Sequence, residues 1–256
     1  MVSVAERPLE LLKGAQWEFF RSKAKHAAMV GGRGSGKTVA DVAKGFYVAG
    51  QYPGIRGCLT SPTYTQLRDN LMPAFRGLFG ETEGSLWEFR RADMEIRFRN
   101  GSLILLRPAT EPDKSRGLDL GFFGMDEIAI EDQLETFIIL QACLRQEGFV
   151  HQGWVTTTPH WRRPWIRKIW AEGRNPVTGR KLPVGEYVIY PAATERNTHL
   201  PEGYVESLRA SAPSERYVRQ ELYGEFIDIE GVAFPQFTER THVRSVPEGM
   251  KVKKRV

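Results

Sequence analysis

A glycine-rich segment has the residue types and spacing of a phosphate-binding loop. It matches the pattern G-x-x-x-x-G-K-[ST] over Gly31, Gly32, Arg33, Gly34, Ser35, Gly36, Lys37 and Thr38. In such a loop, backbone N–H groups curl around phosphate oxygens, the lysine reaches the β- and γ-phosphates, and the hydroxyl ligates Mg²⁺. The segment therefore predicts a site for a nucleoside triphosphate with Mg²⁺. The alternative is a glycine-rich turn that carries a surface lysine.

Two adjacent acids follow an apolar run further along the chain. Asp126 and Glu127 come directly after Phe122-Phe123-Gly124-Met125. In a parallel sheet, the carboxyl end of such a strand lies beside the phosphate loop. This placement predicts that Asp126 holds the Mg²⁺ shell and that Glu127 polarises a water molecule against the γ-phosphate. The alternative is a helix start, where acids interact favourably with the helix dipole.

Three hydroxyls end another apolar run. Thr156, Thr157 and Thr158 follow Gly153-Trp154-Val155 and precede Pro159. Placed beside the γ-phosphate, they would sense its loss and transmit it to the segment that follows. Ordinary polarity at a strand end is the alternative.

The elements that position these residues are visible as periodic patterns. An apolar stretch at residues 26–30 predicts a strand before the loop, and apolar residues at helical spacing predict a helix after it. Further strands are predicted at residues 57–60, 121–125, 153–157 and 187–190, and further helices at residues 66–78, 133–144 and 204–208. Alternating strands and helices predict an α/β fold with a mainly parallel central sheet flanked by helices.

One segment departs from this alternation. Met94, Ile96 and Phe98 alternate with charged residues, and Asn100-Gly101 then leads into a second apolar run. An Asn-Gly pair between two runs of period two is a strong hairpin signal. The sequence predicts an antiparallel hairpin at one edge of the sheet.

Composition excludes several classes of protein. The chain has 256 residues, of which 41% are hydrophobic and 26% charged, with a net charge of +5, as expected of a globular domain. No apolar run approaches the roughly 18 residues of a membrane span, so we expect no membrane partner. The two cysteines, Cys58 and Cys143, have no metal-ligand spacing and fit a reducing cytoplasm.

Together these motifs resemble the ATPase domain of the large terminase subunit of tailed bacteriophages. The resemblance covers most of residues 10–230 and rests on the glycine loop (Walker A), the acids (Walker B) and the threonines. It is also carried by Ser115-Arg116-Gly117-Leu118-Asp119 and by the ending Arg219-Gln220-Glu221-Leu222-Tyr223-Gly224-Glu225-Phe226. It implies a P-loop NTPase of the additional-strand (ASCE) type that hydrolyses ATP with Mg²⁺ and drives double-stranded DNA into the viral capsid.

The resemblance also implies partners and a location. These are double-stranded DNA, the capsid portal and the small terminase subunit, with a homo-oligomeric ring on the capsid and a monomer when isolated. The chain would work in the host cytoplasm, transiently at the viral procapsid.

Carried over residue by residue, the resemblance assigns Lys37 and Thr38 to phosphate and Mg²⁺. It assigns Asp126 to Mg²⁺, Glu127 to the catalytic base, and Thr156 to Thr158 to coupling. Gln16 is similar to a glutamine that reads the adenine edge, and its alternative is an exposed helical residue. Arg33 is similar to a basic loop residue that touches the γ-phosphate of its own site.

Arg116 resembles an arginine finger that enters the nucleotide site of the neighbouring subunit. Such a charge contributes about 10³ to 10⁵ in rate. The alternative is a loop arginine paired with Asp113 or Asp119.

The resemblance divides the chain into two parts. Residues 1–230 would form the ATPase domain, and residues 231–256 would form a linker or tail toward a nuclease domain that this chain lacks. We therefore expect a motor domain that does not cut DNA by itself.

Two basic segments are candidates for contact with DNA phosphates, which need not read sequence. Their candidate residues are Arg90, Arg91, Arg97 and Arg99 in the hairpin region, and Arg162, Arg163, Arg167 and Lys168 in a second segment. Solvated charged faces are the alternative. In the second segment, Trp161, Trp165 and Ile169 recur at helical spacing, which favours core packing over stacking on bases.

Two other functions share these motifs. One is a helicase-like, nucleic-acid-stimulated ATPase, although the sequence shows a single nucleotide-binding core. The other is a nucleotide-gated assembly switch that binds the portal or a small subunit and hydrolyses slowly.

Overall fold

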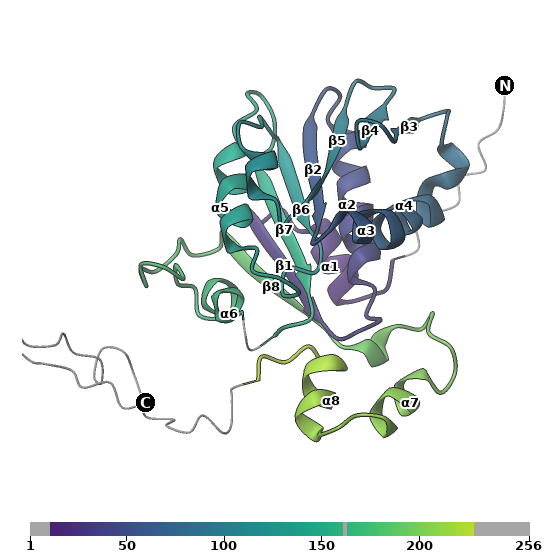
Figure 1. Cartoon of the computed structure of the whole chain (residues 1–256), viewed down its shortest axis with the longest axis vertical. Coiled ribbons are helices and arrows are strands. Elements are labelled where there is room, and N and C mark those ends of the chain that lie inside the picture. Colours follow the sequence, from purple (N-terminus) through teal and green to yellow (C-terminus); the bar gives the residue numbers. More distant parts are fainter. Residues whose placement is uncertain (1–10, 161–162, 228–256) are drawn as a thin grey trace, which may run out of the picture.

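Within residues 11–160 and 163–227, which the computed structural model describes, eight strands form one sheet in the order β3-β4-β5-β2-β6-β7-β1-β8 (Figure 1). The strands are β1 His26–Gly31, β2 Arg56–Ser61, β3 Trp87–Arg90, β4 Glu95–Phe98, β5 Leu103–Pro108, β6 Phe122–Met125, β7 Gln152–Thr157 and β8 Tyr187–Ala192. The helices are α1 Ala15–Arg21, α2 Lys37–Gln51, α3 Tyr64–Gln66, α4 Met72–Phe79, α5 Leu134–Cys143, α6 Pro164–Trp170, α7 Tyr204–Ala210 and α8 Glu215–Glu221. The predicted α/β class is confirmed.

The parallel part of the sheet runs from β5 to β8. Strand β7 lies between β1, which leads into the glycine loop, and β6, which leads into the two acids. An added strand at this place is the feature that defines the ASCE type of P-loop fold, so that prediction is confirmed.

The predicted hairpin lies at one edge of the sheet. Strands β4 and β5 pair antiparallel, while β5 pairs parallel with β2. Gly101 takes a left-handed backbone with φ of 87°, and the Phe98 N–H donates to the Ser102 carbonyl at 2.9 Å. Strand β3, which the sequence patterns did not indicate, pairs with β4 and extends the edge.

Two hydrophobic cores cover the two faces of the sheet because alternate residues of each buried strand point to opposite sides. Ala27 and Met29 of β1 contribute to the core under α1, α2 and α4. Ala28 and Val30 contribute to the core under α5 and α6. Figure 1 shows these two groups of helices on opposite sides of the sheet.

The helical pattern predicted at residues 66–78 is interrupted. A π-helical turn, Leu67–Leu71, joins α3 to α4, and it buries both of its terminal leucines. Pro73 comes two residues after this turn, inside the continuous helical run, and its ring removes one N–H donor from the run.

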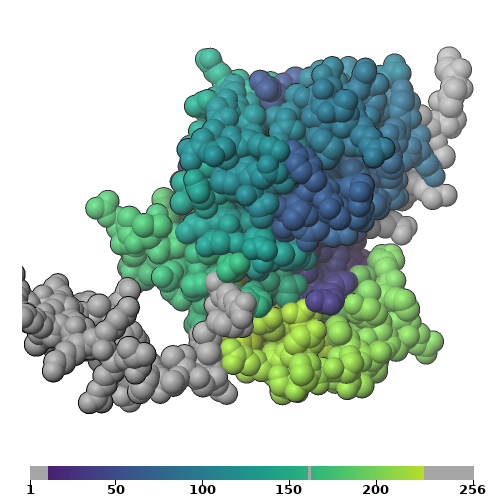
Figure 2. All heavy atoms as spheres, in the orientation of Figure 1, coloured from purple at the N-terminus to yellow at the C-terminus, as the bar shows by residue number. Residues whose placement is uncertain are grey.

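Helices α7 and α8 lie apart from the two helical layers. In the space-filling view they form a separate lobe beside the end of the sheet that carries the glycine loop (Figure 2). No helix among the described residues is long and apolar enough to cross a membrane. The boundary predicted at residue 230, and the linker at residues 231–256, lie outside the described residues.

Candidate functional site

The glycine loop connects β1 to α2 and is enclosed by the α8 region. A Cβ atom at Gly32 would overlap the backbone carbonyls of Glu221 and Leu222, so no larger residue fits there. The Arg33 N–H donates to the Glu221 carbonyl at 2.6 Å. The Thr194 hydroxyl donates to the Arg33 carbonyl at 2.8 Å. The loop therefore depends on residues that are distant in the sequence.

Lys37 lies at the centre of the site. Its ammonium donates to the Gly32 carbonyl at 2.8 Å and to the Thr158 hydroxyl at 3.1 Å. The Glu127 carboxylate lies 3.8 Å from it. Because only 5% of the Lys37 side chain is exposed, its charge acts mainly on these few oxygens. The site thus joins the glycine loop, the acids and the threonines, as predicted.

Asp126 is buried and carries hydrogen bonds from two hydroxyls. Thr38 donates to one carboxylate oxygen at 2.8 Å and Thr156 donates to the other. Burial raises the pKa of Asp126, and the hydrogen bonds from Thr156 and Thr38 oppose that shift. The carboxylate and the Thr38 hydroxyl form a pair of oxygen donors beside Lys37.

A second buried carboxyl group lies behind Asp126. Asp41 of α2 accepts a hydrogen bond from the Trp154 indole at 2.6 Å, and its other oxygen has no partner among the described residues. Burial, together with the charge of Asp126, raises the pKa of Asp41 well above its usual range. Burial and the neighbouring carboxylate therefore favour the protonated form of Asp41.

Glu127 has an unusual backbone. Its φ of 53° lies in the left-handed region, which costs a residue with a side chain about 1 kcal/mol or more. Its side chain is 28% exposed and points into a cavity. Burial raises the pKa of Glu127, while the charge of Lys37 lowers it and that of Asp126 raises it. A raised pKa makes this carboxylate a better proton acceptor at neutral pH.

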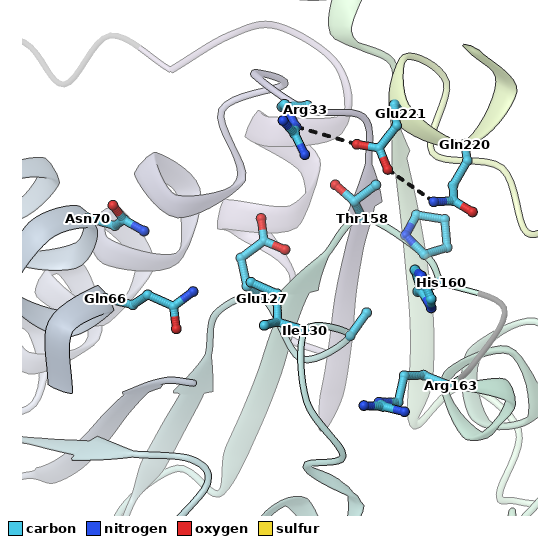
Figure 3. A pocket seen from close by; sticks show the side chains of 12 residues that line it. Arg33, Gln66, Asn70, Glu127, Ile130, Thr158, His160, Arg163, Gln220 and Glu221 are labelled. Atoms are coloured by element: carbon cyan, nitrogen blue, oxygen red, sulfur yellow. Dashed lines mark hydrogen bonds and ion pairs between the residues drawn. The ribbon is translucent and has the colours of Figure 1, made fainter. Parts of the chain in front are cut away.

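The cavity beside Glu127 has a volume of about 430 Å³ (Figure 3). Its walls come from the glycine loop, from the end of α3 and the π-helical turn after it, and from α8. The segment that begins at Glu127 and the segment that begins at Thr158 complete them. The lining residues are Arg33, Gln66, Asn70, Glu127, Ala129, Ile130, Thr158, Pro159, His160, Arg163, Gln220 and Glu221.

A family model, described as the N-terminal part of the terminase large subunit of the T4likevirus type, matches residues 28–241. The chain belongs to the terminase large subunit family.

Solved structures show the same fold in other terminases. The large terminase of the thermophilic bacteriophage D6E superimposes with a TM-score of 0.71 at 16% identity, over 94% of this chain and 60% of that one. Its complex with ADP gives 0.68 at 15% identity, over 90% and 57%. The large terminase ATPase domain of Thermus phage P74-26 gives 0.58 at 21% identity, over 83% and 93%. This chain thus spans about 60% of the length of the D6E terminase. No curated protein matches the sequence.

Gln16 is buried against the glycine loop. Its amide donates to the Gly36 carbonyl at 2.8 Å, and its carbonyl accepts from the Leu12 N–H at 2.5 Å. In this structure it braces the loop, so it is not the exposed helical residue of the alternative interpretation. Its role in reading adenine stays a prediction.

Arg33 and Arg163 both face the cavity (Figure 3). Arg33 is 64% exposed and lies 3.4 Å from the Glu221 carboxylate. Arg163, which the sequence placed among the DNA contacts, is only 19% exposed and lies 3.9 Å from Glu131. It lies in the cavity wall, and its contact with DNA stays a prediction.

Arg116 lies outside this cavity, on an exposed loop. It forms ion pairs with Asp113 at 2.7 Å and with Glu135 at 2.9 Å, and its side chain is 58% exposed. The pairing with Asp113 is the alternative that the sequence analysis left open. The action of Arg116 on a neighbouring subunit stays a prediction, since the structure holds one chain.

The basic residues of the hairpin region are largely paired. Arg90 lies 2.6 Å from Glu88, Arg97 lies 3.0 Å from Glu95, and Arg99 donates to the Gly84 carbonyl at 2.7 Å. Arg91 is exposed in the turn between β3 and β4. These contacts resemble the charged edge of a sheet that discourages strand addition.

The second basic segment divides between core and surface. Trp165 and Ile169 are buried in α6, which confirms core packing for them. Arg167 lies 3.2 Å from Glu172, and Lys168 is exposed. Trp161 and Arg162 lie outside the described residues.

The sequence analysis assigned no role at the site to several residues that lie there. Gln66 reaches the cavity from the end of α3, Asn70 from the π-helical turn that follows, and Glu221 from α8. Glu221 stands in the family-like ending that the sequence analysis quoted, which was the available clue. Nothing local marks Gln66 or Asn70, because their position depends on how one turn of helix is wound.

Proposed function

We propose that this chain is the ATP-hydrolysing motor domain of a viral DNA-packaging terminase, which couples hydrolysis to translocation of double-stranded DNA into the capsid. The observation that carries the proposal is that Lys37 contacts both Thr158 and Glu127, which line one cavity. Thr38, the next residue of the same loop, donates to Asp126. Membership of the terminase large subunit family supports it.

The oxygen donors fit Mg²⁺. Magnesium prefers hard oxygen ligands, and in phosphate sites it takes one or two protein groups, substrate phosphates and water. Asp126 and Thr38 offer a carboxylate and a hydroxyl whose oxygens are 2.8 Å apart. We infer that these two residues hold the ion, which would neutralise charge on the phosphates.

The protein groups supply the remaining chemistry. Lys37 offers a buried positive charge beside the loop, and Arg33 adds an exposed one. Glu127 would take a proton from the attacking water, because its carboxylate faces the cavity and burial raises its pKa.

The three threonines connect these groups. Thr156 binds Asp126, Thr157 accepts from the Ala129 N–H at 3.2 Å, and Thr158 accepts from Lys37. A change at the phosphate would therefore reach β7 and the segment after it. This arrangement supports the coupling role proposed for the motif.

In this proposal the chain works as a homo-oligomeric ring on the capsid portal, with DNA and the small terminase subunit as partners. Its place is the host cytoplasm, transiently at the procapsid. Arg116 completes the site of the neighbouring subunit, and its exposed loop leaves it accessible to one.

The test is ATP hydrolysis measured over a wide range of protein concentration. The rate per subunit is expected to climb with concentration, and Arg116→Ala is expected to lower it about 10³-fold. Mixing Arg116→Ala with Glu127→Ala should restore part of the activity, because one mixed interface then has an intact base and an intact finger.

Arg145→Ala is the matched control. Arg145 is 59% exposed and pairs with Asp119 at 3.7 Å, so its loss should leave turnover unchanged. A rate that is independent of concentration and of Arg116 would contradict a ring motor and favour the helicase-like or switch alternatives.

A further inference from the structure

Gln133 is a buried polar residue that the proposed chemistry does not use. It lies immediately before α5, and none of its surface is exposed. Its amide nitrogen donates to the Glu127 carbonyl at 3.1 Å. Its side-chain oxygen has no hydrogen-bond partner among the described residues. A buried amide that is only half satisfied costs folding free energy, so its presence calls for an explanation.

The Glu127 carbonyl is the group that such an amide can control. Glu127 is, with Met94, one of two non-glycine residues with positive φ in the described ranges. Its carbonyl also accepts from the Ile130 N–H at 3.2 Å, which closes the turn after β6. The left-handed backbone directs the Glu127 side chain into the cavity toward Lys37 (Figure 3).

The other side of this turn is held by β7. The Ile128 N–H donates to the Thr156 carbonyl at 3.3 Å, and the Ala129 N–H donates to the Thr157 hydroxyl at 3.2 Å. The turn is thus fixed by β7 on one side and by Gln133 on the other. Gln133 is the residue whose side chain donates to the Glu127 peptide oxygen.

We propose that Gln133 is a positioning residue for Glu127: its amide holds the Glu127 carbonyl and thereby keeps the carboxylate aimed at the attacking water. This inference rests on the proposed role of Glu127 as the base. Gln133 is fully buried and does not line the cavity, so it acts on the rate of hydrolysis and leaves nucleotide binding to the glycine loop.

The first experiment compares Gln133→Met with wild type in steady-state ATP hydrolysis and in binding of a fluorescent ATP analogue. Gln133→Met keeps the length of the side chain and removes the donor. We expect kcat to fall about 10- to 100-fold, as for a misaligned catalytic group, with the affinity for ATP within about 2-fold of wild type. An unchanged kcat would overturn the proposal.

Gln141→Met is the matched control. Gln141 lies on α5, ~12 Å further along the helix, and its amide donates to the Tyr187 hydroxyl at 3.0 Å. It should leave both kcat and ATP affinity unchanged. Equal losses from Gln133→Met and Gln141→Met would assign both effects to α5 packing and overturn the proposal.

A double variant separates positioning from a general structural effect. If Gln133 acts only through Glu127, then Gln133→Met has no further effect on kcat once Glu127→Gln is present. If the losses of kcat caused by the two single substitutions multiplied in the double variant, the proposal would be overturned. If Glu127→Gln alone keeps full turnover, the proposed function fails instead, so the two failures are distinguishable.

Gln133→Glu covers the case in which Gln133→Met does not fold. A protonated glutamic acid can donate to the Glu127 carbonyl, whereas its carboxylate cannot. The kcat of Gln133→Glu, relative to wild type, should rise as pH falls. A ratio independent of pH would overturn the proposal.

Discussion

At its amino end, β1 begins at His26 inside a cluster of aromatic rings, whereas at its carboxyl end it opens at Gly31 into the phosphate loop. The His26 ring lies 4.7 Å from that of Tyr187 and 5.9 Å from that of Phe137. The Trp170 indole donates to the His26 carbonyl at 3.2 Å. One strand therefore joins a region held by ring packing to a region held by hydrogen bonds.

The carboxyl end shows the opposite construction. There the groups that meet are backbone carbonyls, hydroxyls and charges, and large side chains are excluded from Gly32. Packing energy scales with buried apolar area, while catalysis depends on the placement of a few polar atoms. Substitutions at the two ends should therefore affect different measurements.

The largest expected effect is at the site. Glu127→Gln keeps the shape of the side chain but removes the proton acceptor, so turnover should fall about 10²- to 10⁴-fold. The free energy of unfolding should stay the same or rise, because burial disfavours the charged carboxylate. Initial rates and urea unfolding of the same preparations measure both. A large loss of stability in Glu127→Gln would contradict the division between a catalytic end and a stabilising end of β1.

Trp170→Ala tests the aromatic end. The indole is 5% exposed, and its ring lies 5.3 Å from that of Phe137. Its removal should lower the free energy of unfolding by about 3–5 kcal/mol, as for other buried large-to-small substitutions. Urea unfolding gives this value, and nucleotide binding by the folded protein should be unchanged.

Trp17→Ala is the control for Trp170→Ala. Trp17 is 42% exposed, so its loss should destabilise the protein far less. A Trp170→Ala protein that is fully folded but binds ATP poorly would show that the aromatic end also shapes the site.

The smallest effect concerns pH. Burial, with a contribution from Lys25, lowers the pKa of His26 from 6.5 to about 4. As pH falls from 6.5 to 4, the unfolded chain gains a proton that the folded chain does not. The free energy of unfolding should therefore drop by up to about 3 kcal/mol over this range and stay level below it.

Urea unfolding at pH 7 and pH 5 measures this dependence in wild type and in His26→Leu. The substitution should remove the part of the pH dependence that belongs to His26. An equal drop in the free energy of unfolding in both proteins would assign the pH dependence to other groups and would show that His26 does not contribute to it.

The sequence predicted the parts of this fold that depend on local pattern. The glycine loop, the acids at the end of β6 and the Asn100-Gly101 turn each have a chemical reason at their own position, and the structure places each in the predicted element. Strand β3 was missed, because four residues with a single fully buried side chain, Trp87, give no clear alternation.

The sequence could not predict those parts of the site that depend on contacts between residues far apart in the chain. Nothing near Glu221 shows that its carbonyl accepts from Arg33, and nothing near Gln133 shows that it reaches Glu127. Arg163 resembled its basic neighbours, yet the fold turns it toward the cavity while Lys168 faces outward. Side-chain direction at these positions is decided by tertiary packing.

The enclosure of the glycine loop by the α8 region bears on synthesis of the chain. The whole phosphate motif leaves the ribosome early, but Glu221 and Leu222, whose carbonyls line the loop at Gly32, emerge much later. A nascent chain that still lacks Glu221 and Leu222 has the phosphate motif without the backbone that packs against Gly32. Tight nucleotide binding should therefore arise late in translation, as a sign that this domain has been completed.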